Sequence, residues 1–168
     1  MSDRWKLGDV LIWFITGNEQ NARTDADVKL VFYSADDEPI GWLRAYERGD
    51  LGGFEQGETN LGFIGNLNQQ AWLKQLLSAG TRLEVSVNSP DPGNAAWCPE
   101  SISLDFRVGP VVDVSTARTW NINEWIVQGE EPYRYDAEGD PQTGASLFEE
   151  VGFEKELELE TGVGEPPE

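Results

Sequence analysis

The residues of this chain whose types could do chemistry are oxygen donors, and they gather in three polar segments. The segments cover residues 18–27, 49–53 and 89–94, and together they contain Asp, Asn, Ser and Thr side chains. Calcium binds about six to eight oxygen atoms from carboxylates, amides and carbonyls at irregular spacing. Turns between strands use the same residue types, because Gly, Pro, Asn and Asp reverse the chain. On spacing alone, solvation of an acidic protein is the simpler interpretation, and a cation site is the alternative.

Composition excludes several familiar kinds of active site. The chain contains no histidine, which removes Ser-His and Cys-His nucleophiles and most zinc sites. It also lacks the glycine-rich loops that bind nucleotide phosphates. The single cysteine, Cys98, lies between Trp97 and Pro99, where packing is the simpler role. A carboxylate pair of the glycosidase kind stays open because 31 acidic residues make accidental pairs inevitable, but we expect no enzyme.

The charge of the chain limits its partners. Its 168 residues have a net charge of −19, and residues 128–168 contribute −11 of it. This sign argues against nucleic acid as a partner, and it repels anionic lipid unless a cation neutralises the contact face. The first residues lack the regions of a signal peptide, and no apolar run approaches the ~20 residues of a membrane span. We therefore expect a cytoplasmic protein without a transmembrane segment, one that reaches membranes only peripherally.

Apolar and alternating runs predict mostly β-strands. The continuous apolar run at 10–15 is typical of a central strand, and the alternation at 28–33 and 82–87 is typical of strands with one buried face. Further strands are expected at 40–46, 61–67, 101–108, 111–114 and 115–127. The regular spacing of runs and turns favours an all-β fold, an antiparallel β-sandwich of about eight strands.

Two parts of the chain depart from this strand pattern. Residues 69–77 predict one short helix, because their apolar side chains fall on one side. These side chains are Trp72, Leu73, Leu76 and Leu77. Residues 1–127 are therefore expected to form the sandwich, and residues 128–168 an acidic C-terminal extension. Within the extension, residues 153–160 are expected to add an edge strand or to fold only on contact, and residues 161–168 are expected to be disordered.

Five short motifs occur in order between residues 8 and 127. They are T-G at 16–17 followed by A-R-T-D-A-D-V-K-L at 22–30, F-E-Q-G-E-T-N at 54–60, I-G-N-L at 64–67, W-C-P-E-S-I at 97–102 and W-N-I-N-E-W-I at 120–126. Their order resembles the PLAT domain, the β-sandwich found in lipoxygenases, animal lipases, clostridial α-toxin and polycystin-type membrane proteins. The resemblance implies a non-catalytic module that binds membranes or partner proteins, often with calcium at one end.

The resemblance also assigns calcium ligands. The ligands carried over by motif are the carbonyl oxygen of Ala22 or Arg23, then Thr24 and the carboxylate of Asp25, with Asp50, Asp91 and Asn94 as looser matches. This chain departs from the family pattern at Arg23, where Gly is usual, and at Asp27, where Asn is usual. The guanidinium of Arg23 could neutralise Asp25 and replace the ion. Calcium is therefore the expected cofactor, with an internal ion pair as the alternative.

Aromatic and aliphatic residues beside such an ion would contact the membrane interface. Leu51 is the first candidate for this role and Trp42 the second. The simpler roles are an ordinary exposed leucine for Leu51 and packing on a sheet face for Trp42. Three further tryptophans, Trp97, Trp120 and Trp125, occupy motif positions and are expected in the core.

Three functions from different classes are consistent with these residues. The first is a calcium-assisted binding module for lipid or membrane surfaces. The second is a protein-interaction module without a working metal site, in which the acidic surface and tail contact a basic partner. The third is an acidic mimic that blocks a nucleic-acid-binding protein. The loop motifs favour the first function, and the net charge favours the second.

Overall fold

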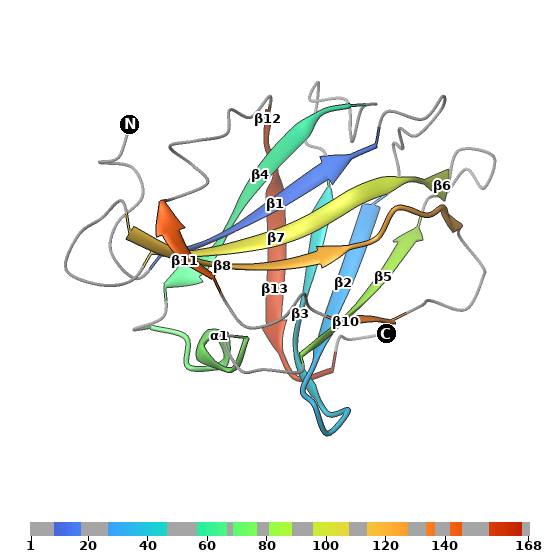
Figure 1. Cartoon of the computed structure of the whole chain (residues 1–168). Coiled ribbons are helices and arrows are strands. Elements are labelled where there is room, and N and C mark those ends of the chain that lie inside the picture. Colours follow the sequence, from blue (N-terminus) through green and yellow to red (C-terminus); the bar gives the residue numbers. More distant parts are fainter. Residues whose placement is uncertain are drawn as a thin grey trace.

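The computed structural model contains two β-sheets packed face to face, which confirms the predicted all-β sandwich (Figure 1). It describes residues 9–17, 27–46, 57–66, 69–76, 81–88, 96–107, 114–127, 134–136, 142–145 and 155–165. Neighbouring strands of the two sheets are antiparallel, except for one short pair at an edge. None of the described helices is long and apolar enough to cross a bilayer.

The described residues form thirteen strands, of which eight are six residues or longer. The strands are β1 (Asp9–Thr16), β2 (Asp27–Tyr33), β3 (Pro39–Tyr46), β4 (Thr59–Asn66), β5 (Arg82–Asn88), β6 (Ala96–Trp97), β7 (Pro99–Arg107), β8 (Val114–Asn121), β9 (Ile126–Val127), β10 (Arg134–Asp136), β11 (Gln142–Ala145), β12 (Lys155–Glu156) and β13 (Glu158–Val163). The first sheet has the order β11-β8-β7-β1-β4-β12, and the second has β10-β5-β2-β3-β13. A small third sheet pairs β6 with β9.

Inward side chains of both sheets fill the space between them. Val28, Leu30 and Phe32 on β2 are fully buried, as their alternation predicted. The inward residues of β5 and β7 behave in the same way; they are Leu83, Val85, Val87, Ile102, Leu104 and Phe106. The rings of Phe32 and Trp120 join the two sheets, with centroids 5.8 Å apart. One apolar core therefore holds the sandwich together.

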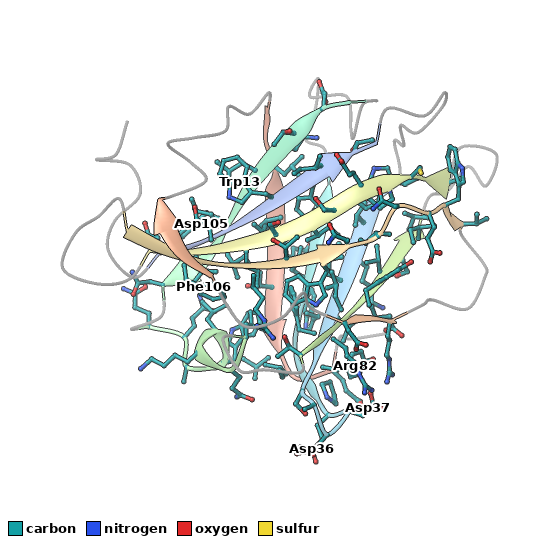
Figure 2. The ribbon with its side chains drawn as sticks, in the orientation of Figure 1. Trp13, Asp36, Asp37, Arg82, Asp105 and Phe106 are labelled. Atoms are coloured by element: carbon teal, nitrogen blue, oxygen red, sulfur yellow. The ribbon has the colours of Figure 1, made fainter. Side chains whose placement is uncertain are left out.

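Strand β1 is buried on both of its faces. Val10, Ile12 and Phe14 belong to the core between the sheets. Leu11 and Trp13 point the other way by alternation, yet they are only 0% and 1% exposed. The continuous apolar run at 10–15 is the sequence signature of this double burial, since a strand with one solvent-exposed face would alternate apolar and polar residues. Figure 2 labels Trp13 on this strand.

The predicted helix exists but is shorter than expected. Helix α1 covers only Trp72–Gln75, and residues 69–71 are turns rather than helix. Trp72, Leu73 and Leu76 are buried as predicted, whereas Leu77 lies outside the described residues. Ala71 at the N-cap makes no side-chain capping bond, and a single turn is unstable in isolation. Packing therefore holds it in place, with the Trp72 ring lying where a side chain at Gly41 would otherwise be.

The outermost strand at every edge of the two large sheets comes from the acidic extension. β10 pairs with β5 and β13 with β3 in the second sheet, while β11 pairs with β8 and β12 with β4 in the first. Figure 1 shows these strands in orange to red. Tyr135 and Leu159 pack against the core, and Leu157 belongs to it. In the described residues the extension thus covers the sheet edges that would otherwise be open to other strands.

The prediction that residues 161–168 are disordered is wrong for their first part. Thr161, Gly162 and Val163 lie in β13 and pair with β3. This part of the chain can pair with β3 because Gly162 lies opposite Trp42 and leaves room for its indole ring. A Cβ atom at this position would lie 2.3 Å from Nε1 of the Trp42 indole. The acidic, glycine-containing sequence gives no sign of this contact, because the partner indole is more than a hundred residues away in the chain.

Candidate functional site

Backbone bonds gather the ends of several strands at one end of the sandwich. The amide of Thr16 donates to the carbonyl of Glu58 at 3.0 Å, and the amide of Gly17 donates to the carbonyl of Cys98 at 2.9 Å. Gly57 in turn donates to Gly17 at 3.0 Å. Asp27 at the start of β2 pairs with Asn88 at the end of β5. We call this region the loop end; it lies toward the upper right of Figure 1.

The three polar segments singled out in the sequence all connect strands at the loop end. The first segment follows Gly17 and ends at Asp27, the first residue of β2, and the second segment lies between β3 and β4. The third follows β5 and precedes β6. The expected ligands themselves fall outside the described residues, as does Leu51; these ligands are Ala22, Arg23, Thr24, Asp25, Asp50, Asp91 and Asn94. Within the described part of the chain, no three His, Cys, Asp or Glu residues group as a metal site.

The carboxylate of Asp27, the last residue of the first segment, is held by an arginine. Asp27 Oδ2 accepts hydrogen bonds from Arg44 Nη2 at 2.6 Å and from Arg44 Nε at 3.1 Å. The two side chains are 31% and 46% exposed, so the pair is a surface ion pair of modest strength. Arg44 balances the negative charge of Asp27.

A buried hydrogen bond fixes Thr16, the last residue of β1, just before the first segment. Trp97 Nε1 donates to Thr16 Oγ1 at 3.0 Å, and both residues are at most 1% exposed. The Trp97 ring also lies 6.3 Å from the Phe14 ring. The expectation that Trp97 and Trp120 belong to the core is confirmed, since both are fully buried. Trp97 thus attaches the start of β6 to the end of β1.

The expectation that Trp125 is a core residue is wrong. Its side chain is 43% exposed, and Val127, two residues on, is 39% exposed. The chain turns at Asn123, which has a φ of 49° and donates its amide to the carbonyl of Pro99. After this turn Ile122 and Ile126 fill the core, so Trp125 faces solvent. Motif position alone could not reveal this, because the turn depends on a backbone bond to a distant strand.

Trp125 and Val127 belong to the loop end. Ile126 pairs with Trp97 and Val127 with Ala96, which lies two residues after the third polar segment. The two exposed apolar side chains therefore lie at the end of the sandwich at which these strands meet. Trp42 lies elsewhere. It is in the middle of β3, four residues before Tyr46, and its indole covers Gly162. Its position favours the packing role.

The opposite end of the sandwich has its own group of charges. We call it the hairpin end, since it surrounds the turn between β2 and β3. Arg82 Nε lies 3.2 Å from Asp136 Oδ1, and its Nη1 lies 3.6 Å from Asp37 Oδ1. Asp37 also accepts a hydrogen bond from Arg134. Figure 2 labels Asp37 and Arg82 at this end.

Tyr33 lies at the centre of the hairpin end. Its hydroxyl donates to Glu84 Oε2 at 3.2 Å, and the Arg134 guanidinium lies 3.8 Å from its ring centroid. Partial burial, followed by the charge of Glu84, raises the pKa of Tyr33 above its usual value. The hydrogen bond to Asp37 raises the pKa of Arg134. The acids of this cluster therefore meet arginines of the same chain, which suits attachment of β10 rather than binding of a cation.

Comparison with known proteins supports the fold and no more. No protein-family model and no curated protein sequence matches this chain. The structure of coral 8R-lipoxygenase is similar over 77% of this chain and 17% of its own, at 11% identity and a TM-score of 0.53. The alpha toxin of Clostridium absonum is similar over 77% of this chain and 31% of its own, at 17% identity and a TM-score of 0.50. This chain thus spans less than a third of either protein and shares a β-sandwich with them.

Proposed function

We propose that this protein is a non-catalytic binding module that docks its loop end on lipid surfaces with the help of calcium. One observation carries the proposal: three oxygen-rich segments connect strands at a single end of the sandwich, and Trp125 and Val127 are exposed at that same end. An ion and an apolar anchor in one place are what peripheral membrane contact requires. Coral 8R-lipoxygenase is described as activated by calcium via a C2-like domain, which supports the same role here.

The chemistry of the donors suits calcium. Asp25, Asp50 and Asp91 would supply carboxylates, and Thr24, Asn94 and a carbonyl of Ala22 or Arg23 would supply neutral oxygens. A bound ion would neutralise part of a chain whose net charge is −19, and so remove the repulsion from anionic headgroups. The internal alternative is an ion pair between Arg23 and Asp25, like the one that Arg44 forms with Asp27.

The apolar contribution would come from Trp125 and Val127. An indole is favourable at the boundary between headgroups and hydrocarbon, and a half-exposed tryptophan at the ion-binding end is already positioned to enter it. Leu51 in the second segment remains a candidate for the same contact. Trp42 is a weaker candidate because its ring covers Gly162.

The test is co-sedimentation with vesicles that contain anionic lipid, with and without millimolar calcium. We expect calcium to increase the bound fraction, and we expect Trp125→Ala to reduce it severalfold, because the variant loses most of its interfacial contact. The matched control is Phe63→Ala, since Phe63 is an aromatic residue of similar exposure, 42%, toward the other end of β4. Equal binding with and without calcium would contradict the proposal, as would equal losses in the two variants.

A metal-free protein-interaction module is the second candidate, and the ion pair of Asp27 with Arg44 favours it. That pair shows an acid of the loop end neutralised by the protein itself. If the neighbouring acids are neutralised in the same way, calcium will change neither the melting temperature nor vesicle binding, whereas a bound ion would raise the melting temperature by mass action. The described strands of the extension lie in the sheets, so they would present their acidic residues to a partner as part of the sandwich surface.

A further inference from the structure

The turn between β8 and β9 places Trp125 in solvent, and other parts of the sandwich hold this turn. Asn123 has a φ of 49°, in the left-handed region, and its amide donates to the carbonyl oxygen of Pro99 at 3.0 Å. Asparagine adopts this region more readily than most residues, but surrounding contacts must hold it there. Ile122 and Ile126, before and after the turn, are buried in the core. Both ends of the turn are therefore anchored, and its conformation sets where the indole lies.

Glu124, the residue of the turn directly before Trp125, is held by the acidic extension. The hydroxyl of Tyr135 on β10 donates a hydrogen bond to Glu124 Oε1. The Tyr135 ring packs against the core, and Arg134 beside it binds Asp37 at the hairpin end. Strand β10 also pairs with β5. The extension is thus anchored independently of the turn, and Tyr135 connects it to the residue beside Trp125.

We propose that Tyr135 is a positioning residue for Trp125, so that the acidic extension takes part in docking at the loop end. The inference rests on the proposed contact of Trp125 with lipid and names the residue that holds the indole in place. While Tyr135 binds Glu124, the left-handed turn is kept and the indole stays on the solvent side. When this bond is lost, the turn samples other conformations, and part of the free energy of docking is used to order it again.

Variants of the two bonded residues isolate the contribution of this hydrogen bond. Tyr135→Phe keeps the ring and removes only the hydroxyl, and we expect it to lower vesicle binding about threefold, the size typical of one hydrogen bond. The matched control is Tyr33→Phe, whose hydroxyl binds Glu84 at the hairpin end, and it should bind like the natural chain. Glu124→Gln and Glu124→Ala remove the same charge, but only Gln keeps an acceptor oxygen. The Ala variant should therefore bind vesicles about threefold more weakly than the Gln variant.

The experiment is co-sedimentation of the full chain with anionic vesicles at millimolar calcium, in a double-mutant cycle of Tyr135→Phe and Trp125→Ala. We expect Tyr135→Phe to lower binding about threefold in the natural chain and to have no effect in Trp125→Ala, where no indole remains to be positioned. Amide hydrogen exchange without lipid tests the turn itself. Exchange at Asn123, whose amide is bonded to Pro99, should be about threefold faster in Tyr135→Phe than in the natural chain or in Tyr33→Phe.

The outcomes separate this inference from the function on which it rests. Unchanged vesicle binding in Tyr135→Phe overturns the positioning role and leaves the proposed function standing. An equal loss in the natural chain and in Trp125→Ala also overturns it, because Tyr135 would then act through the stability of the fold. Equal exchange at Asn123 in all chains would show that the turn does not depend on this bond, and would overturn the inference too. A natural chain that does not bind vesicles rejects the proposed function, and the positioning role with it.

Discussion

The two ends of the sandwich look alike in sequence and differ in structure. The hairpin end contains the acidic run 36–38, and the loop end is bordered by equally acidic segments. At the hairpin end, Asp37 meets both Arg82 and Arg134, and Glu84 binds Tyr33. Its acids are thus used to join β5, β10 and the β2–β3 turn. At the loop end the described acid Asp27 is likewise held by an arginine, Arg44, so the comparison teaches that a group of acidic residues does not by itself indicate a cation site.

The largest effect is expected if the extension is removed, because the hairpin end then loses Arg134 and β10, and both large sheets lose their edge strands. A chain ending at Val127 loses Arg134, the edge strands β10–β13, the buried Leu157 and the partly buried Leu159. Burying one leucine contributes roughly 1.5–3 kcal/mol, so we expect a loss of several kcal/mol and of cooperative thermal unfolding. Thermal unfolding followed by circular dichroism measures this loss of stability and of cooperativity. A chain shortened only to Glu165 should melt like the natural one, and an unchanged melting temperature after removal of 128–168 would refute the structural role of the extension.

Neutralising one acid at each end of the sandwich tests the difference between the two ends more directly. Asp25→Asn should weaken the calcium-induced rise in melting temperature severalfold, because it removes a carboxylate from the expected ligands. Asp37→Asn removes the same charge from the hairpin end, where Arg82 and Arg134 already bind it. It should leave the calcium response unchanged. Differential scanning fluorimetry with and without calcium distinguishes the two, and equal effects would mean that calcium acts through net charge alone.

The smallest effect concerns the titration of Tyr33 at the hairpin end. Its pKa is raised in the folded state, chiefly by burial and then by Glu84. A raised folded pKa gives stability that is full below the unfolded value, about 10, and that is lost as pH rises through the folded value. Stability should therefore decrease above pH about 10. Glu84→Gln should lower the pKa of Tyr33, whereas Asp136→Asn should leave it unchanged. NMR of the Tyr33 ring as a function of pH measures this pKa, and equal changes of the pKa in the two variants would contradict the prediction.

Much of the fold could be predicted because strand signals are local. The alternation in β2, β5 and β7 and the continuous run in β1 each follow from the pattern of side chains on one strand. The exposure of Trp125 could not be predicted in this way. It depends on the left-handed turn at Asn123 and a bond to Pro99. For the candidate site, sequence indicated the segments rich in oxygen donors, but not that their flanking strands meet at one end.

The sequence by itself determined where the strands lie, which of their faces are apolar, and which chemistry the chain lacks, since it contains no histidine. Only the tertiary structure decided which acids meet arginine, which tryptophan is exposed, and that the acidic extension supplies the edge strands. The physical reason is the separation in sequence of the residues that interact. Burial patterns repeat every two residues within a strand, whereas ion pairs and edge pairing join residues such as Arg44 and Glu160 through a register that no local pattern encodes.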